Sequence, residues 1–106
     1  MSKYQPNGTP LTDYERELLV ILMEECAEVI QAASKLIRFG KENRPPTGFP
    51  HSEISNSTYL GLEAGDLDYM IRLVREAGII SLKDIGAGHQ RKMARLDQYM
   101  QHSKGS

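Results

Sequence analysis

The chain has 106 residues, 40% hydrophobic and 25% charged, and its basic and acidic side chains nearly cancel to a net charge of -1. These values are typical of one soluble globular domain, residues 1–106, and exclude a fibrous or wholly disordered chain. The charge balance argues against a nucleic-acid partner, because proteins that bind phosphate backbones usually carry a basic excess. A chain this short has a modest core, so we expect an oligomer that covers part of its apolar surface.

The cysteine content and the polar chain ends indicate the compartment. Cys26 has no partner for an intramolecular disulfide, and the sequence holds no Cys/His cluster with zinc spacing. The longest apolar run, residues 18–23, is far too short to cross a bilayer, and residues 1–11 and 102–106 are predicted to be flexible. We therefore expect a cytoplasmic protein with no membrane partner.

The first predicted helix begins after Thr12. Thr12 and Glu15 have the spacing of a capping box, in which each side chain accepts a hydrogen bond from the other residue's backbone N–H. No glycine or proline follows until Gly40, so the helix should end near Phe39 with Gly40 as its cap.

A long loop and a second helix follow. Residues 40–53, GKENRPPTGFPHSE, hold three prolines and two glycines and are predicted to be a loop. A loop of this length either serves as a lid or binding loop or only connects two elements. The second helix should begin between Ser52 and Ser57 and end near Ala77, before Gly78.

The C-terminal part is predicted to hold a short turn and a last helix. Ser81 has the position of an N-cap, but Gly86 and Gly88 should interrupt the turn that it opens. The last helix is then expected from about His89 to Gln101. No segment alternates as a strand does, so the predicted fold class is all-α, a helical bundle.

Helical periodicity of about 100° per residue places several carboxylates on faces that should be buried. Glu25 falls inside the apolar stripe of the first helix and Glu28 at its edge, whereas Glu24 lies toward solvent. Glu63 and Asp66 fall on the apolar side of the second helix, so each helix presents two carboxylates one turn apart. The first stripe comprises Leu18, Ile21, Leu22, Val29, Ala32, Ala33, Leu36 and Phe39; the second comprises Tyr59, Leu62, Leu67, Met70, Leu73, Val74 and Ala77.

Converging ionised carboxylates must be protonated, paired with bases or neutralised by a metal. Bases are scarce, because Arg72 and Arg75 are predicted to face outward and only Lys35 and Lys92 lie at the stripe edges. Oxygen ligands without His or Cys favour a hard cation, Mg²⁺ or Mn²⁺, shared with substrate phosphates, whereas a di-iron site would want ExxH motifs. The alternative is that these acids pair with Arg or Lys of another subunit.

Two ordered motifs carry a family resemblance. Glu25-Cys-Ala-Glu28, within EECAEVIQAASK, and Glu63-Ala-Gly-Asp66, within LEAGDLDYMI, resemble the metal-binding helices of the MazG-like branch of the all-α NTP pyrophosphatases. The resemblance covers roughly residues 12–77. It implies a four-helix core completed by oligomerisation, as a homodimer or homotetramer. Two features depart from the family pattern: Asp68 stands where an apolar residue is common, and the connection between the two motifs is longer than in compact members.

The resemblance also implies an activity. It is the Mg²⁺-dependent hydrolysis of nucleoside triphosphates, dNTPs or non-canonical NTPs, to monophosphate and pyrophosphate, which is housecleaning of the nucleotide pool. Carried over residue by residue, the metal ligands are Glu25, Glu28, Glu63 and Asp66, and Glu24 acts with Glu25 to position the attacking water. Basic residues that could contact the phosphates are Lys35, Lys41, Arg44 and Lys92.

Other hypotheses stay open. One is a non-catalytic helical oligomerisation or regulatory module, and another is a related enzyme acting on a different phosphoanhydride such as phosphoribosyl-ATP. A helix-turn-helix DNA-binding protein is disfavoured, because the last helix lacks a supporting basic face. Cys26 is expected to pack near the apolar stripe, and His89 to lie in a packed or interface position. Phe49 and Tyr59 are expected to pack, with stacking on a nucleobase as the alternative.

Overall fold

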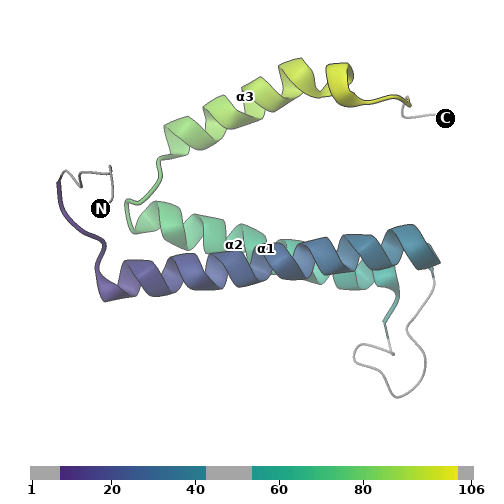
Figure 1. Cartoon of the computed structure of the whole chain (residues 1–106), viewed down its shortest axis with the longest axis horizontal. Helices are drawn as coiled ribbons and strands as arrows, with labels where there is room; N and C mark the ends of the chain where they lie inside the picture. Colours follow the sequence, from purple (N-terminus) through teal and green to yellow (C-terminus); the bar gives the residue numbers. More distant parts are fainter. Residues whose placement is uncertain (1–7, 43–53, 103–106) are drawn as a thin grey trace, which may run out of the picture.

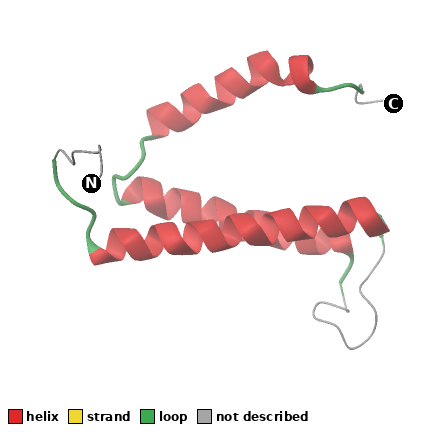
Figure 2. Cartoon of the chain, in the orientation of Figure 1, coloured by secondary structure: helices red, strands yellow, loops and turns green. Residues whose placement is uncertain are grey.

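The computed structural model describes residues 8–42 and 54–102. These ranges contain three helices, α1 (Asp13–Phe39), α2 (Asn56–Glu76) and α3 (Leu82–Tyr99), and no strand (Figures 1 and 2). The predicted all-α class is therefore confirmed. None of the helices in the described part is long and apolar enough to cross a membrane. The predictions of flexible chain ends and of a long loop fall largely on residues outside the described ranges.

The ends of α1 lie where local chemistry predicts them. The backbone N–H of Glu15 donates to Oγ1 of Thr12 at 3.1 Å, and the backbone N–H of Thr12 donates to Oε1 of Glu15 at 2.8 Å. This is a complete capping box. At the other end Gly40 has a φ of 87° and its N–H donates to the carbonyl of Leu36. Because an L side chain rarely adopts that φ, glycine suits this position.

The second helix also agrees with its predicted limits. Ser55 is the N-cap, and its Oγ accepts a hydrogen bond from the backbone N–H of Thr58 at 3.1 Å. The helix ends at Glu76 with Ala77 as its cap, and Gly78 follows with a φ of 81°. The left-handed conformation of Gly78 reverses the chain and lets the N–H of residue 79 bond back into the last turn.

The third helix corrects the prediction for the C-terminal part. Ser81 is the N-cap as expected, but α3 then runs without a break through Gly86 and Gly88 to Tyr99. The left-handed glycines among the described residues do not include these two. Glycine inside a helix costs about 1 kcal/mol relative to alanine, which weakens a helix without ending it. The predicted start at His89 was therefore wrong.

α1 and α2 form an antiparallel pair, with the start of α1 beside the end of α2 (Figure 1). Leu18, Met70 and Val74 form a buried cluster at that end. At the opposite end of the pair the amide of Asn56, which is buried, donates to the carbonyl of Gly40 at 3.4 Å. The two ends of the helical pair are thus closed by apolar packing and by a hydrogen bond, and the acidic motifs lie between them.

The apolar stripes are covered unevenly. The predicted stripe residues Leu18, Ala32, Tyr59, Met70 and Val74 are buried. By contrast, Phe39 and Leu62, also predicted to belong to the stripes, are more than half exposed. α3 stands apart from the helical pair in Figure 1, and none of its residues is buried. The described part of the chain therefore has one two-helix core and a third helix with little cover.

Candidate metal centre

The acidic motifs of α1 and α2 meet halfway along the helical pair. Glu25 lies near the middle of α1, and Glu63 and Asp66 lie one turn apart near the middle of α2. One carboxylate oxygen from each of these three residues lies within 4.8 Å of the other two. Glu25 and Glu63 are half-buried, and Asp66 is exposed. The structure thus brings together three of the four predicted metal ligands, in an acidic cluster open to solvent on one side.

The acidic cluster has the donor set and spacing of a hard-cation site. Ligand oxygens that share one Mg²⁺, Mn²⁺ or Ca²⁺ ion, at metal–oxygen distances of about 2.0–2.6 Å, lie at most about 4–5 Å apart. The 4.8 Å limit among the three carboxylates fits that requirement. Within the described ranges no basic residue forms an ion pair with them, and the ion pair found there joins Arg72 to Glu76. The residues present can therefore hold a divalent cation.

Glu25 experiences the electrostatic cost of this arrangement. Its pKa is raised from the ordinary value of 4.5, first because partial burial removes water from the carboxylate. The negative charges of Asp66 and Glu63 raise the pKa further, and those of Glu28 and Glu24 contribute less. Without a cation, proton uptake at Glu25 relieves this repulsion. A cation bound among the carboxylates would relieve it in the same sense.

Glu28, the fourth predicted ligand, has a separate partner. The hydroxyl of Tyr59 donates to Oε2 of Glu28 at 3.3 Å, and Nζ of Lys35 lies 5.3 Å from the centre of the Tyr59 ring. The pKa of Tyr59 rises to about 12, because burial and the negative charges of Glu63 and Glu28 disfavour the phenolate, and hydrogen bonding to these carboxylates favours the protonated hydroxyl. Tyr59 therefore links Glu28 to Glu63 of the acidic cluster.

Tyr59 is the site residue whose role the sequence did not reveal. Its position on an apolar face predicted packing, which is confirmed by its 7% exposure, with base stacking as the alternative. The hydrogen bond to Glu28 crosses from α2 to α1 and depends on how the two helices are aligned. The signal available in the sequence was a hydroxyl on a buried face, which usually finds a polar partner.

The other predicted site residues are more scattered. Glu24 is exposed, as its helical phase indicated, and it lies near enough to Glu25 to affect that residue's pKa. Lys35 is half-buried against the Tyr59 ring, and Lys41 is exposed just after α1. Arg44 lies outside the described residues. Of the two arginines predicted to face outward, Arg72 is exposed and Arg75 is half-buried.

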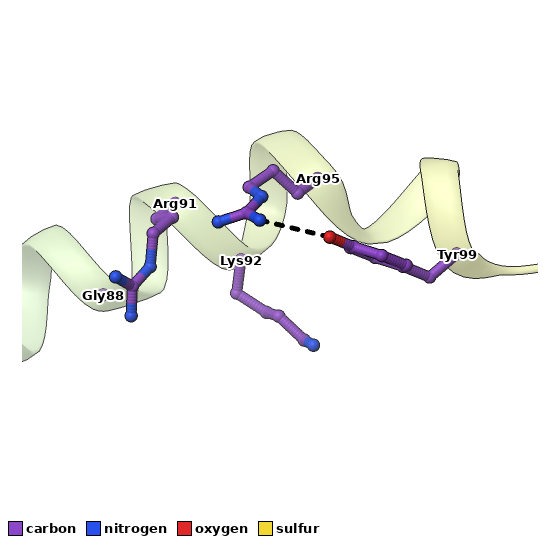
Figure 3. A pocket seen from close by; sticks show the side chains of 5 residues that line it. All are labelled: Gly88, Arg91, Lys92, Arg95 and Tyr99. Carbon is purple, nitrogen blue, oxygen red and sulfur yellow. Dashed lines mark hydrogen bonds between the residues drawn. The ribbon is translucent and has the colours of Figure 1, made fainter.

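Lys92 belongs to a basic face of α3. A hollow of about 270 Å³ opens over Gly88, where no side chain projects, and is lined by Arg91, Lys92, Arg95 and Tyr99 (Figure 3). Nη2 of Arg95 donates to the Tyr99 hydroxyl at 3.1 Å, and Nζ of Lys92 lies 5.8 Å from the centre of the Tyr99 ring. All of these side chains are on one helix, so this hollow is not part of the acidic cluster on α1 and α2.

The packed position predicted for Cys26 was wrong, and for His89 only the packed position, not the interface position, is excluded. Cys26 is exposed, although its helical phase placed it near the apolar stripe, because α2 covers the other side of α1. His89 is also exposed, so it has no packed position within the described chain. Phe49 lies outside the described residues. These results leave the acidic cluster and Tyr59 as the main polar arrangement between helices.

Comparison of the chain with protein-family models, with curated proteins and with solved structures gives no match.

Proposed function

We propose that this protein hydrolyses nucleoside triphosphates to the monophosphate and pyrophosphate with Mg²⁺, or with Mn²⁺ in its place. The observation that carries the proposal is the approach of carboxylate oxygens of Glu25, Glu63 and Asp66 to within 4.8 Å of one another. Negative charges so close together call for a cation, and a cation held only by oxygens with open positions is suited to phosphate substrates.

The resemblance of the two acidic motifs to the MazG-like pyrophosphatases refines this proposal. It makes dNTPs or non-canonical NTPs the preferred substrates and removal of unwanted nucleotides the biological role. It also gives a homodimer or homotetramer in the cytoplasm, whose four-helix core is completed by oligomerisation. The ligand set is then Glu25, Glu28, Glu63 and Asp66.

The chain's own residues divide the work of hydrolysis. Bound Mg²⁺ would neutralise charge on the phosphate oxygens and lower the pKa of bound water, and hydrolysis of a phosphoanhydride needs both effects. We propose that Glu24, which is exposed and whose charge acts on Glu25, orients the attacking water and accepts its proton, with Glu25 as its partner. Tyr59 fixes the carboxylate of Glu28 by its hydrogen bond, and so limits the directions in which that ligand can point.

Basic residues on α1, in the segment that follows it and on α3 would neutralise the rest of the triphosphate. Lys35 is held against Tyr59, about two turns beyond Glu28 on α1, and we propose that its ammonium group contacts a phosphate. Lys41 and Arg44 follow α1 in the chain. Lys92 lies on α3, and we propose that it contacts phosphate through the basic face that it shares with Arg95.

The exposed apolar surface of α3 favours a second candidate function, that of a non-catalytic helical interaction module. None of the α3 residues is buried, and Leu82, Met93 and Tyr99 are all more than 60% exposed. Such a module would bind a partner helix, and its acidic cluster would hold a structural cation or none. It therefore gives no nucleotide turnover.

The test is pyrophosphate release from a panel of canonical and modified NTPs and dNTPs, with phosphoribosyl-ATP included, in Mg²⁺ and in EDTA. Wild type should turn over at least one substrate only with the metal present. Glu63→Gln removes one ligand charge and should lower kcat/KM by at least about 100-fold, the scale expected when a metal ligand is lost.

A matched control comes from the same helix. Asp68→Asn also removes one negative charge from α2, but Asp68 is exposed and is not part of the acidic cluster, so turnover should be close to wild type. Equal loss in both variants, or turnover that persists in EDTA, would contradict the metal site. No turnover on any substrate would favour the interaction module, whereas turnover of phosphoribosyl-ATP alone would change the substrate.

A further inference from the structure

α1 has a second apolar face that no described residue of the chain covers. Val20, Met23, Ile30 and Ile37 are 53%, 70%, 69% and 86% exposed. These residues lie on the side of α1 away from the stripe that packs on α2, whose members Leu18 and Ala32 are buried. A helix that is apolar on both sides is normally central in a bundle, with neighbours on both sides.

The exposed face has the spacing of a helix–helix seam. Val20, Met23, Ala27, Ile30, Ser34 and Ile37 follow one another at alternating steps of three and four residues. This repeat is the a/d pattern of coiled coils, and it extends over about 26 Å of helix. The small residues Ala27 and Ser34 alternate with the larger ones, so a second helix can approach closely at these points. We call these six residues the α1 seam.

Covering the α1 seam would stabilise the folded chain. In the described ranges only five apolar side chains are buried, namely Leu18, Ala32, Tyr59, Met70 and Val74. A core of that size gives little stability to a chain of this length, because folding must overcome the entropy of every ordered residue. Covering the α1 seam would add a second apolar layer on the opposite side of α1.

The charges beside the α1 seam indicate which partner packs against it. Glu24, Gln31 and Arg38 follow the d positions of the repeat, so opposite charges stand at the two ends and a neutral amide at the middle. All three side chains are exposed, and neither Glu24 nor Arg38 forms an ion pair within the described residues. The seam is therefore self-complementary when a second copy of the same helix lies antiparallel to it.

We propose that the α1 seam is the interface with a second copy of this chain, the two α1 helices lying antiparallel across a two-fold axis near Gln31. Glu24 then faces Arg38 of the partner subunit at each end, and the small residues Ala27 and Ser34 face one another across the interface, which lets the two helices approach closely. The two α1–α2 pairs form a four-helix bundle. The proposal rests on the proposed function only in that it identifies the interface of the homo-oligomer. Apart from Glu24, which the proposed mechanism also uses, its observations are independent of the acidic cluster.

The first test compares two apolar residues of equal exposure. Ile30, in the α1 seam, is 69% exposed, and Met93, on α3, is 70% exposed. Sedimentation equilibrium should give wild type at least twice the 11.9 kDa mass of one chain. Ile30→Glu should raise the dimer dissociation constant by at least about 100-fold, because it places a charge in an apolar contact, while Met93→Glu leaves it unchanged.

Each other outcome overturns the proposal. A monomeric wild type at assay and higher concentrations would remove the interface altogether. Dissociation by Met93→Glu but not by Ile30→Glu would transfer the interface to α3. Circular dichroism is the control for misfolding. Ile30 is exposed in the single chain, so its replacement should leave the helix content of the monomer unchanged.

The second test addresses the antiparallel arrangement. Glu24→Arg and Arg38→Glu each place like charges opposite one another and should weaken the dimer, whereas the double exchange should restore it. The two positions are too far apart on α1 for rescue within one chain. A double variant no tighter than the single ones would rule out this pairing. Because the readout is mass, a wild type that is dimeric but turns over no nucleotide would count against the proposed function alone.

Discussion

Glu25 is held in an environment that opposes its charge. It is half-buried, and Asp66, Glu63, Glu28 and Glu24 all act to raise its pKa after the effect of lost hydration. A carboxyl group whose pKa is higher in the folded state stabilises the fold most when it is protonated, below the unfolded pKa near 4.5. That contribution is lost as the pH rises through the folded pKa.

The upward shift of the Glu25 pKa predicts how the stability of the cation-free protein depends on pH. In EDTA, Glu25→Gln should raise Tm at pH 7, because the neutral amide removes the repulsion that ionised Glu25 experiences. The difference from wild type should shrink as the pH falls below 4.5, where wild-type Glu25 is also neutral. Thermal unfolding followed by circular dichroism from pH 3.5 to pH 8 measures both effects.

Added Mg²⁺ should reverse the order of the two proteins. Wild type gains stability from a cation bound only in the folded state, whereas Glu25→Gln has lost a ligand and gains less. Asp68→Asn, on the outer side of α2, serves as the control and should follow wild type in EDTA and in Mg²⁺. A Glu25→Gln variant less stable than wild type at pH 7 in EDTA would show that the carboxylate is held by attraction rather than repulsion.

At the scale of the elements, two glycines of the same chain should respond oppositely to alanine. Gly78 has a φ of 81°, and no atom lies within 4 Å of an added Cβ, so the cost of Gly78→Ala is backbone strain alone. We expect a loss of roughly 1–2 kcal/mol in the free energy of unfolding, measured by urea denaturation. Gly86 also has open space around it, but it lies inside α3 with helical geometry.

Gly86→Ala should therefore strengthen α3. Alanine is about 1 kcal/mol better than glycine in a helix interior, which corresponds to a slowing of amide exchange in α3 by up to about fivefold. Hydrogen exchange read by mass spectrometry on peptides from this helix measures the change. Faster exchange in Gly86→Ala, or no loss of stability in Gly78→Ala, would contradict the backbone conformations found for these two positions.

The whole molecule is expected to have two levels of stability. Leu18, Met70 and Val74 are buried between α1 and α2, whereas α3 buries none of its residues. Amides of the helical pair should exchange only through global unfolding, and those of α3 through far smaller local openings. Hydrogen exchange on wild type at neutral pH measures this contrast. Equal protection of α3 and α2 would mean that a partner covers α3, and would conflict with an interface limited to the α1 seam.

The helix limits were predictable because caps are local. The Thr12 box, the Ser81 cap and the left-handed Gly40 each depend on a few neighbouring residues. The helix break expected at Gly86 and Gly88 is absent from α3. The low helix propensity of glycine costs only a small free energy, which the flanking residues can offset.

The side chains that meet across helices were only partly predictable. Periodicity identified which carboxylates lie on the inner faces, so the approach of Glu25 to Glu63 and Asp66 agrees with the sequence analysis. It did not predict that Glu28 would bond to Tyr59, because that contact depends on the rotation and offset of α1 against α2. The exposure of Cys26 has the same origin, since α2 covers only one side of α1.

By itself, the sequence determined the limits of α1 and α2, the N-caps and the pairing of acidic residues one turn apart, because these follow from backbone geometry over a few residues. Only the tertiary structure decided which carboxylates converge, that Tyr59 joins Glu28 to them, and that the second apolar face of α1 is uncovered. These features depend on how two helices pack, and packing is set by the fit of many side chains from distant parts of the chain.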